Sequence, residues 1–118
     1  AGCVRVILTS DPDWPDQVRG ATGGQGVRAV YDGIGQATFT GALDTLAPLG
    51  MMVSFGQASG ALPPVDTHEL ARRGSLFLTR PSLMDYMRPA GAQAEAARAY
   101  FAGLREGWLA VDVPQRFA

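Results

Sequence analysis

The sequence predicts an α/β fold: a three-layer domain with a mainly parallel sheet of about four strands. Two apolar runs, residues 27–32 and 51–55, each end on glycine, and a segment long enough for a helix separates them. A strand, a helix and a second strand in this order form a βαβ unit, whose parallel strands place their carboxyl ends at one edge of the sheet. Strands that alternate with helices favour an α/β layer fold with right-handed crossovers.

The N-terminal segment is predicted to form a strand and then a helix. Residues 4–8 are apolar and branched, as in a short strand, and the proline-containing stretch 10–15 interrupts them. Asp13 is a good N-cap, and the helix that it starts runs to about Thr22, where two glycines stop it.

The central segment carries the βαβ unit. Residues 27–32 form its first strand, and a Gly-Ile-Gly turn at 33–35 leads into a helix over 36–46. Four apolar side chains of this helix fall at helical spacing on one face, namely Phe39, Ala42, Leu43 and Leu46. A proline and a glycine then end the helix, and residues 51–55 form the second strand.

The C-terminal part begins after a proline-rich loop. Asp66 caps a short helix that runs to about Arg73, and residues 75–79 form a fourth strand. Residues 84–108 are mostly helical, and 111–113 form a final extended piece. The apolar stripe of the long helix consists of Ala94, Ala97, Phe101 and Leu104.

Composition excludes several classes of function. The chain has 118 residues, about the length of one domain. A hydrophobic content of 47% with 18% charged residues is not that of a disordered chain, and no apolar stretch is long enough to cross a bilayer. The net charge of -1 and the scattered arginines argue against nucleic acid or an anionic membrane as a partner. A single cysteine fits a reducing compartment and predicts a cytoplasmic protein.

Metal binding and histidine catalysis are not expected. Cys3 and His68 are the only cysteine and the only histidine, so the sequence holds no cluster with zinc-ligand spacing. His68 lies in the first turn of a predicted helix, where solvent exposure accounts for it. We therefore assign no metal ligand and no catalytic residue.

The turn after residues 27–32 is the first candidate binding site. It contains Asp32, Gly33, Ile34 and Gly35. Glycines let the backbone turn sharply and approach a ligand, and an acidic side chain accepts hydrogen bonds from a ribose hydroxyl. The alternative is a turn that needs glycine only for its geometry, with Asp32 capping the next helix.

Two further candidate sites follow the later strands. The loop Phe55–Gly60 holds more small and polar residues than a tight turn needs, so it exposes backbone donors and acceptors. Chain reversal alone is the alternative role for this loop. Leu78 and Thr79 end another strand and precede Arg80, for which pairing with a surface carboxylate is the alternative.

These segments, together with the stretch RRGSLFLTRPSL at 72–83, closely resemble the zinc-free quinone oxidoreductases, relatives of zeta-crystallin in the medium-chain dehydrogenase/reductase superfamily. The resemblance covers nearly the whole chain and implies a Rossmann-like domain that binds NADPH. It implies that Phe55, Gly56 and Gln57 hold the nicotinamide carboxamide through main-chain groups, with Ser59 in the same site. It also places the turn at 32–35 near the adenosine half of the cofactor, and Leu78 and Thr79 near the nicotinamide pocket.

The same resemblance implies that the chain is only part of a domain. Strand 4–8 matches the third strand of the family, so the first two strands, the pyrophosphate loop and the N-terminal catalytic domain are absent. Residues 1–118 are thus predicted to be a partial nucleotide-binding domain that is inactive alone and binds NADPH weakly or not at all. Strand 4–8 is expected to pair with strand 27–32 or with another chain.

Three functions remain open at this point. The parent protein is either an NADPH-dependent quinone reductase or another medium-chain reductase, such as an enoyl reductase; the third possibility is a catalytically silent self-association module. An apolar edge strand is a template for pairing, and the resemblance also implies a homodimer. The predicted contact residues are Ser75, Leu76, Phe77, Leu78 and Thr79. The alternative is an edge that the helix at 89–107 shields.

Overall fold

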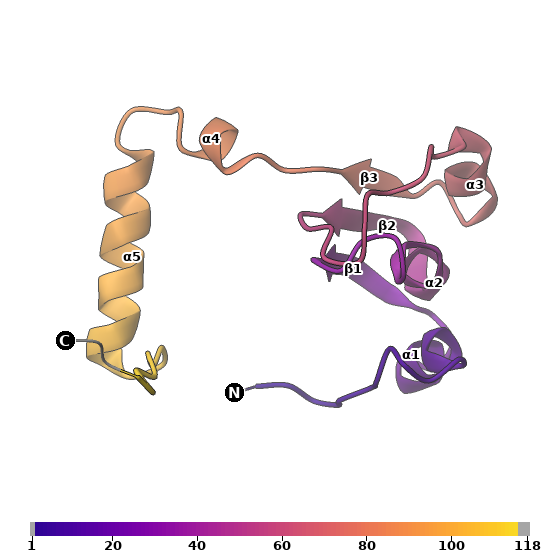
Figure 1. Cartoon of the computed structure of the whole chain (residues 1–118), viewed down its shortest axis with the longest axis horizontal. Helices are drawn as coiled ribbons and strands as arrows, with labels where there is room; N and C mark the ends of the chain where they lie inside the picture. Colours follow the sequence, from indigo (N-terminus) through magenta and orange to yellow (C-terminus); the bar gives the residue numbers. More distant parts are fainter. Residues whose placement is uncertain (1, 116–118) are drawn as a thin grey trace. The chain divides into compact units, whose positions relative to one another are not determined.

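The computed structural model describes residues 2–115, which divide into two compact units, one ending at Pro81 and one beginning at Ser82 (Figure 1). The first unit alternates helices and strands in the order α1 (Trp14–Ala21), β1 (Val27–Asp32), α2 (Phe39–Thr45), β2 (Leu46–Ser54), α3 (Thr67–Arg72) and β3 (Phe77–Thr79). The strands form one parallel sheet in the order β1-β2-β3. The predicted α/β fold is confirmed, with three strands in place of about four.

The helix ends follow the local sequence. α1 begins after Asp13 and has Pro15 in its first turn, where the missing N–H costs no hydrogen bond. The carboxylate of Asp13 accepts a hydrogen bond from Gln17 Nε2 at 3.0 Å instead of capping the backbone. α3 begins after Asp66, whose Oδ1 accepts a hydrogen bond from the His68 N–H at 2.9 Å, so this predicted cap is confirmed.

β2 begins at Leu46, earlier than the predicted start at residue 51. The proline and glycine that were expected to end the helix lie inside the strand, in an irregular stretch near its start. Its register with β1 shifts between Val27 and Ala29. Leu49 has a φ of 61°, and its N–H donates a hydrogen bond to the Gly74 carbonyl at 2.8 Å. A contact distant in sequence therefore holds the proline and glycine of this segment within a strand, where local propensity predicts a helix end.

The core of the first unit lies between α2 and one face of the sheet. The buried cluster consists of Phe39, Ala42, Leu43, Leu46, Met52 and Leu76. The predicted apolar stripe is thus confirmed as core, although Leu46 belongs to β2. Burial of each large side chain stabilises the fold by about 1.5–3 kcal/mol.

The opposite face of the sheet is open within this unit. Ala29, Met51 and Phe77 lie in register across the three strands, and Tyr31 follows on the same face. Tyr31 is 74% exposed and Phe77 56%. Within the described residues of this unit, helices therefore cover one face of the sheet, and the third predicted layer is not present.

The predicted strand at residues 4–8 is wrong. This segment has no strand assignment, and Val4, Val6 and Leu8 are exposed. Branched apolar residues favour a strand only where a neighbouring strand satisfies the backbone and covers the side chains. The segment pairs with no strand of the described chain, so pairing with β1 is also wrong, while pairing with another chain stays a prediction.

The second unit consists of α4 (Leu83–Tyr86) and α5 (Ala92–Glu106). Residues 84–108, predicted to be mostly helical, lie largely in these two helices, and the segment between the helices contains Pro89, which lacks the N–H that a helix interior needs. Gly107 ends α5 with a φ of 78°, and the Trp108 ring packs against Gly103. The predicted stripe of α5 is only partly covered within this unit, since Phe101 is 56% exposed and Leu104 is half-buried. Residues 111–113 form no strand, and no described helix is long and apolar enough to span a membrane.

Candidate functional site

Two loops meet at the carboxyl edge of the sheet, one after β1 and one after β2. We call residues 33–36 and 55–60 together the rim. β1 and β2 are parallel neighbours with Asp32 opposite Ser54, so their following loops begin side by side. The sequence-predicted turn and the Phe55–Gly60 loop are therefore brought together, as a βαβ unit requires.

Main-chain hydrogen bonds join the two loops into one structure. The N–H groups of Phe55 and Gly56 donate to the Asp32 carbonyl at 3.0 and 3.2 Å. Farther along, the Ser59 N–H donates to the Ile34 carbonyl at 2.8 Å. Much of the polar backbone of the rim is thus used within the protein, which fixes the shape of the loops.

The side chain of Ser59 also joins the two loops by hydrogen bonds. Its Oγ donates a hydrogen bond to the Ile34 carbonyl at 2.8 Å and accepts one from the Ala37 N–H at 2.9 Å. The hydroxyl thus has two partners on the neighbouring loop. This geometry gives Ser59 a positioning role in addition to the cofactor contact that remains a prediction for it.

Two glycines are required where the loops touch. A Cβ on Gly56 would lie 2.3 Å from the carbonyl oxygen of Gly33, and one on Gly35 would lie 2.8 Å from that of Gly60. Gly35 also has a φ of 93°, which L side chains rarely adopt. The glycines of the rim therefore allow one loop to approach the other. The sequence analysis had explained the same glycines by a close approach of the backbone to a ligand.

Asp32 lies inside the turn. It is 4% exposed, and its Oδ1 accepts hydrogen bonds from the N–H groups of Ile34 at 2.7 Å and Gly35 at 3.2 Å. The hydroxyl of Thr38, also buried, donates to the same carboxylate. These contacts match the alternative of a structural turn, although the N-cap residue of α2 is Thr38 and not Asp32 as that alternative had it. The sequence analysis did not single out Thr38, although a hydroxyl six residues after an aspartate at a strand-to-helix turn is a usable signal.

The surface of the rim that faces solvent is uncharged. Phe55 is 57% exposed and Ile34 40% exposed, and Gln57 is exposed as well. The Phe55 ring lies against Gly33, since a Cβ there would meet it at 3.0 Å. This edge therefore offers an aromatic ring, an aliphatic side chain and an amide to a ligand.

The residues at the end of β3 extend the rim on its other side. Leu78 pairs with Met52 and Thr79 with Val53, and both Leu78 and Thr79 are half-buried. Arg80 Nη1 donates to the carbonyls of Ser54 at 3.3 Å and Gly56 at 3.4 Å. The carboxylate partner considered for Arg80 is thus replaced by two main-chain oxygens at the rim.

Ser54 and His68 are polar residues that lie outside the rim. The Ser54 Oγ is buried and has no hydrogen-bond partner among residues 2–115, a feature that the sequence did not indicate. His68 is exposed on α3, where its N–H meets the Asp66 cap. Within residues 2–115, no group of three or more His, Cys, Asp or Glu side chains could hold a metal ion.

Comparison with known proteins identifies the family. The zinc-binding dehydrogenase family model matches residues 1–99. The chain belongs to this family. It is 39% identical over 116 residues to quinone oxidoreductase 1 of Escherichia coli, which covers 98% of this chain and 36% of that protein. It is 41% identical over 117 residues to a 2-haloacrylate reductase of Burkholderia, with 98% and 35% covered.

A solved structure agrees with the family match and with these two relatives. The structure of Escherichia coli quinone oxidoreductase complexed with NADPH superposes with a TM-score of 0.89 at 39% identity, covering 95% of this chain and 34% of that one. The resemblance to quinone oxidoreductases and the Rossmann-like fold are confirmed. The chain spans about a third of the length of these relatives.

Proposed function

We propose that this chain is the C-terminal part of the nucleotide-binding domain of an NADPH-dependent reductase that acts on a quinone or a similar conjugated carbonyl. The similarity over 98% of the chain to a quinone oxidoreductase is the observation that carries the proposal. The NADPH named with the superposed relative supports the choice of cofactor. Bound NADPH supplies a hydride from its nicotinamide C4, which with one proton from solvent reduces a quinone to a hydroquinone.

The rim fits the uncharged end of such a cofactor. Its exposed residues are Phe55, Ile34 and Gln57, which offer apolar contact and amide hydrogen bonding. Main-chain groups of 55–57 would orient the nicotinamide carboxamide, and Gly33, Ile34 and Gly35 would lie toward the adenosine half. Leu78 and Thr79 would border the ring from the end of β3. Asp32 and Ser59 would position the loops of the rim for the cofactor through their hydrogen bonds.

The rim does not fit the pyrophosphate. Among residues 33–36, 55–60 and 78–80, Arg80 is the only charged side chain, and its Nη1 is engaged by two carbonyls. Phosphate recognition needs donors or positive charge directed at the anion. We therefore propose that a longer polypeptide supplies this contact, together with the substrate pocket, and that the isolated chain binds NADPH weakly and has no turnover.

Three classes of acceptor share one chemical feature. A quinone and a 2-haloacrylate both carry a carbon–carbon double bond conjugated to a carbonyl group, and both are named for relatives of similar identity. An enoyl thioester has the same conjugation and represents the other medium-chain reductases. We place the quinone first because the LFLTRP and FGQASG segments resemble those of the quinone oxidoreductases.

A chimera tests the proposal. The chain replaces the matching third of Escherichia coli quinone oxidoreductase 1, and NADPH oxidation is measured with a quinone, a 2-haloacrylate and an enoyl thioester. We expect turnover with the quinone, because this chain would then supply the rim that holds the cofactor. The other two acceptors are controls for the substrate pocket, which comes from the Escherichia coli part of the chimera. A folded chimera that consumes no NADPH with any acceptor would contradict the reductase role and favour the silent self-association module.

A homodimer through the β3 edge is the proposed assembly. β3 lies at one end of the sheet order, so one of its edges has no partner strand among the described residues. Phe77 is 56% exposed, whereas Leu76 is already buried in the core of the unit. Two copies pairing antiparallel about a two-fold axis would satisfy both edges. Leu76 would then support the interface from inside its own unit.

We also propose a cytoplasmic location.

A further inference from the structure

An arginine-lined hollow lies at the amino edge of the sheet, away from the rim. Its volume is about 300 Å³, and its polar lining consists of Arg19, Arg72, Arg73 and Asp44. Arg19 comes from the last turn of α1, Asp44 from the last turn of α2, and Arg72 and Arg73 from the end of α3. These helix ends precede the three strands, whose arrowheads point away from α1, α2 and α3 in Figure 1.

The hollow is distinct from the rim because it lies at the other end of the strands. β1 has six residues and so spans about 20 Å. A ligand in the hollow would therefore not touch the loops that follow β1 and β2. Nothing in the proposed reductase function uses these arginines.

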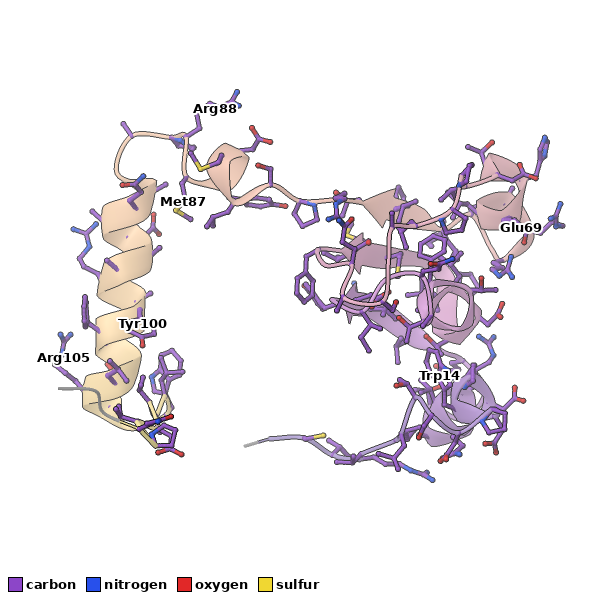
Figure 2. The ribbon with its side chains drawn as sticks, viewed as in Figure 1. Trp14, Glu69, Met87, Arg88, Tyr100 and Arg105 are labelled. Atoms are coloured by element: carbon purple, nitrogen blue, oxygen red, sulfur yellow. The ribbon has the colours of Figure 1, made fainter. Side chains whose placement is uncertain are left out.

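The lining carries more positive than negative charge. Three guanidinium groups face one carboxylate, that of Asp44, so the lining has an excess of two positive charges. Glu69, labelled on α3 in Figure 2, lies outside this lining but pairs with Arg72 and Arg73, and it lowers the excess of positive charge in the neighbourhood to one. Positive charge in a concave site raises the local concentration of anions.

Two of the arginines are held in place by the fold. Arg19 Nη1 donates to the carbonyls of Asp44 at 2.8 Å and Leu46 at 3.2 Å, at the end of α2. Arg73 Nε donates to Asp44 Oδ1 at 2.7 Å, and its side chain is only 23% exposed. Fixed guanidinium groups lose little conformational entropy when a ligand binds.

Several donors remain available in this arrangement. Among the described residues, Arg19 Nε and Nη2, Arg72 Nε and Nη1, and Arg73 Nη2 have no acceptor. Planar guanidinium forks match the oxygens of a phosphate and bind them through charge-assisted hydrogen bonds. We propose that this hollow binds a phosphate group, either inorganic phosphate or the phosphate of a small monoester.

The test follows the arginine Nε–Hε signals of the full chain by NMR. Sodium phosphate is added at constant ionic strength, with sodium chloride as the balancing salt. We expect saturable shifts of the Arg19, Arg72 and Arg73 signals with phosphate. A parallel titration with methyl phosphate shows whether an organic ester binds more tightly than the free anion, and binding of either probe supports the site.

Charge-matched variants decide between a site and a general charge effect. Loss of one guanidinium donor to a phosphate is expected to weaken binding about tenfold in Arg72→Gln. Arg98→Gln, an exposed arginine of α5, removes the same charge and should leave the affinity within about twofold. Glu69 is the only side-chain hydrogen-bond partner of Arg72 among the described residues, so its variant should remain folded even if Arg19→Gln does not. Shifts no larger than those with chloride, or equal losses in Arg72→Gln and Arg98→Gln, would show that the arginines form internal ion pairs only.

Discussion

The hydroxyl of Thr38 contacts both carboxylate oxygens of Asp32, at 3.0 and 3.1 Å, and both side chains are buried. The same carboxylate accepts two N–H groups from the turn that follows β1. A buried carboxylate is tolerated because donors surround it. This pair therefore holds the first loop of the rim and the start of α2 in one geometry.

Asp32→Ala should destabilise the chain by about 3 kcal/mol, because three donors, two of them buried, lose a charged acceptor. Urea unfolding measures the change in the free energy of unfolding. Asp66→Ala is the matched control, since Asp66 caps α3 at an exposed position, where the loss is about 1 kcal/mol. Equal losses in the two variants would contradict a buried structural role for Asp32.

Gly56→Ala should separate the two loops of the rim. The added Cβ would lie 2.3 Å from the Gly33 carbonyl oxygen, a backbone atom that cannot rotate away. We expect a loss of about 2 kcal/mol or more in the free energy of unfolding. Gly20→Ala in α1 meets no atom within 4 Å, so it should stabilise by about 0.5–1 kcal/mol. An unchanged melting temperature for Gly56→Ala would show that the loops do not pack this closely.

Two serine-to-alanine variants should differ in their effect on the free energy of unfolding. Ser54 Oγ is buried without a partner, so its removal should be neutral or slightly stabilising. Ser59 Oγ joins Ile34 to Ala37, so its removal should cost about 1–2 kcal/mol. Thermal unfolding of both variants checks this contrast. A clear loss of stability in Ser54→Ala would reveal a partner, such as a bound water, for that hydroxyl.

Local sequence predicted the elements whose signals are complete within a few residues. Asp66 was predicted as a cap, and the Phe39, Ala42 and Leu43 stripe as core, because a cap or a helical face needs no distant partner. The strand predicted at residues 4–8 was wrong for the opposite reason. Branched side chains favour a strand, but a strand forms only beside another strand. The start of β2 likewise depends on Leu49 bonding to Gly74, which sequence periodicity does not show.

The candidate site was predicted in position but not in orientation. The sequence placed the turn at 32–35 and the loop at 55–60 at one edge, because parallel strands require it. It did not show that Asp32 and Ser59 turn toward the other loop. Side-chain direction in a loop is set by its contacts, and these involve residues distant in the sequence.

The chain should self-associate through the edge of β3. Sedimentation at high micromolar concentration is expected to show a dimer, and Leu78→Pro should yield monomer or unfolded chain, because proline disrupts strand pairing. Leu83→Pro is the control, since residue 83 is the first residue of α4, where proline is tolerated. A monomeric unmodified chain would rule out this assembly.

The most direct test of the central claim is an NMR titration of the isolated chain with NADPH, carried out in phosphate buffer so that the arginine-lined hollow is already exposed to an anion. The account predicts weak, saturable shifts of the Gly33, Gly35, Gly56 and Gln57 amides, with a dissociation constant in the millimolar range. Such weak binding is expected because the rim lacks charged groups for the pyrophosphate. If NADPH shifts the amides of the second unit more strongly than those of the rim, or binds with micromolar affinity, either the rim is not the nucleotide-contacting edge or the chain already holds the pyrophosphate contact, and the account is contradicted.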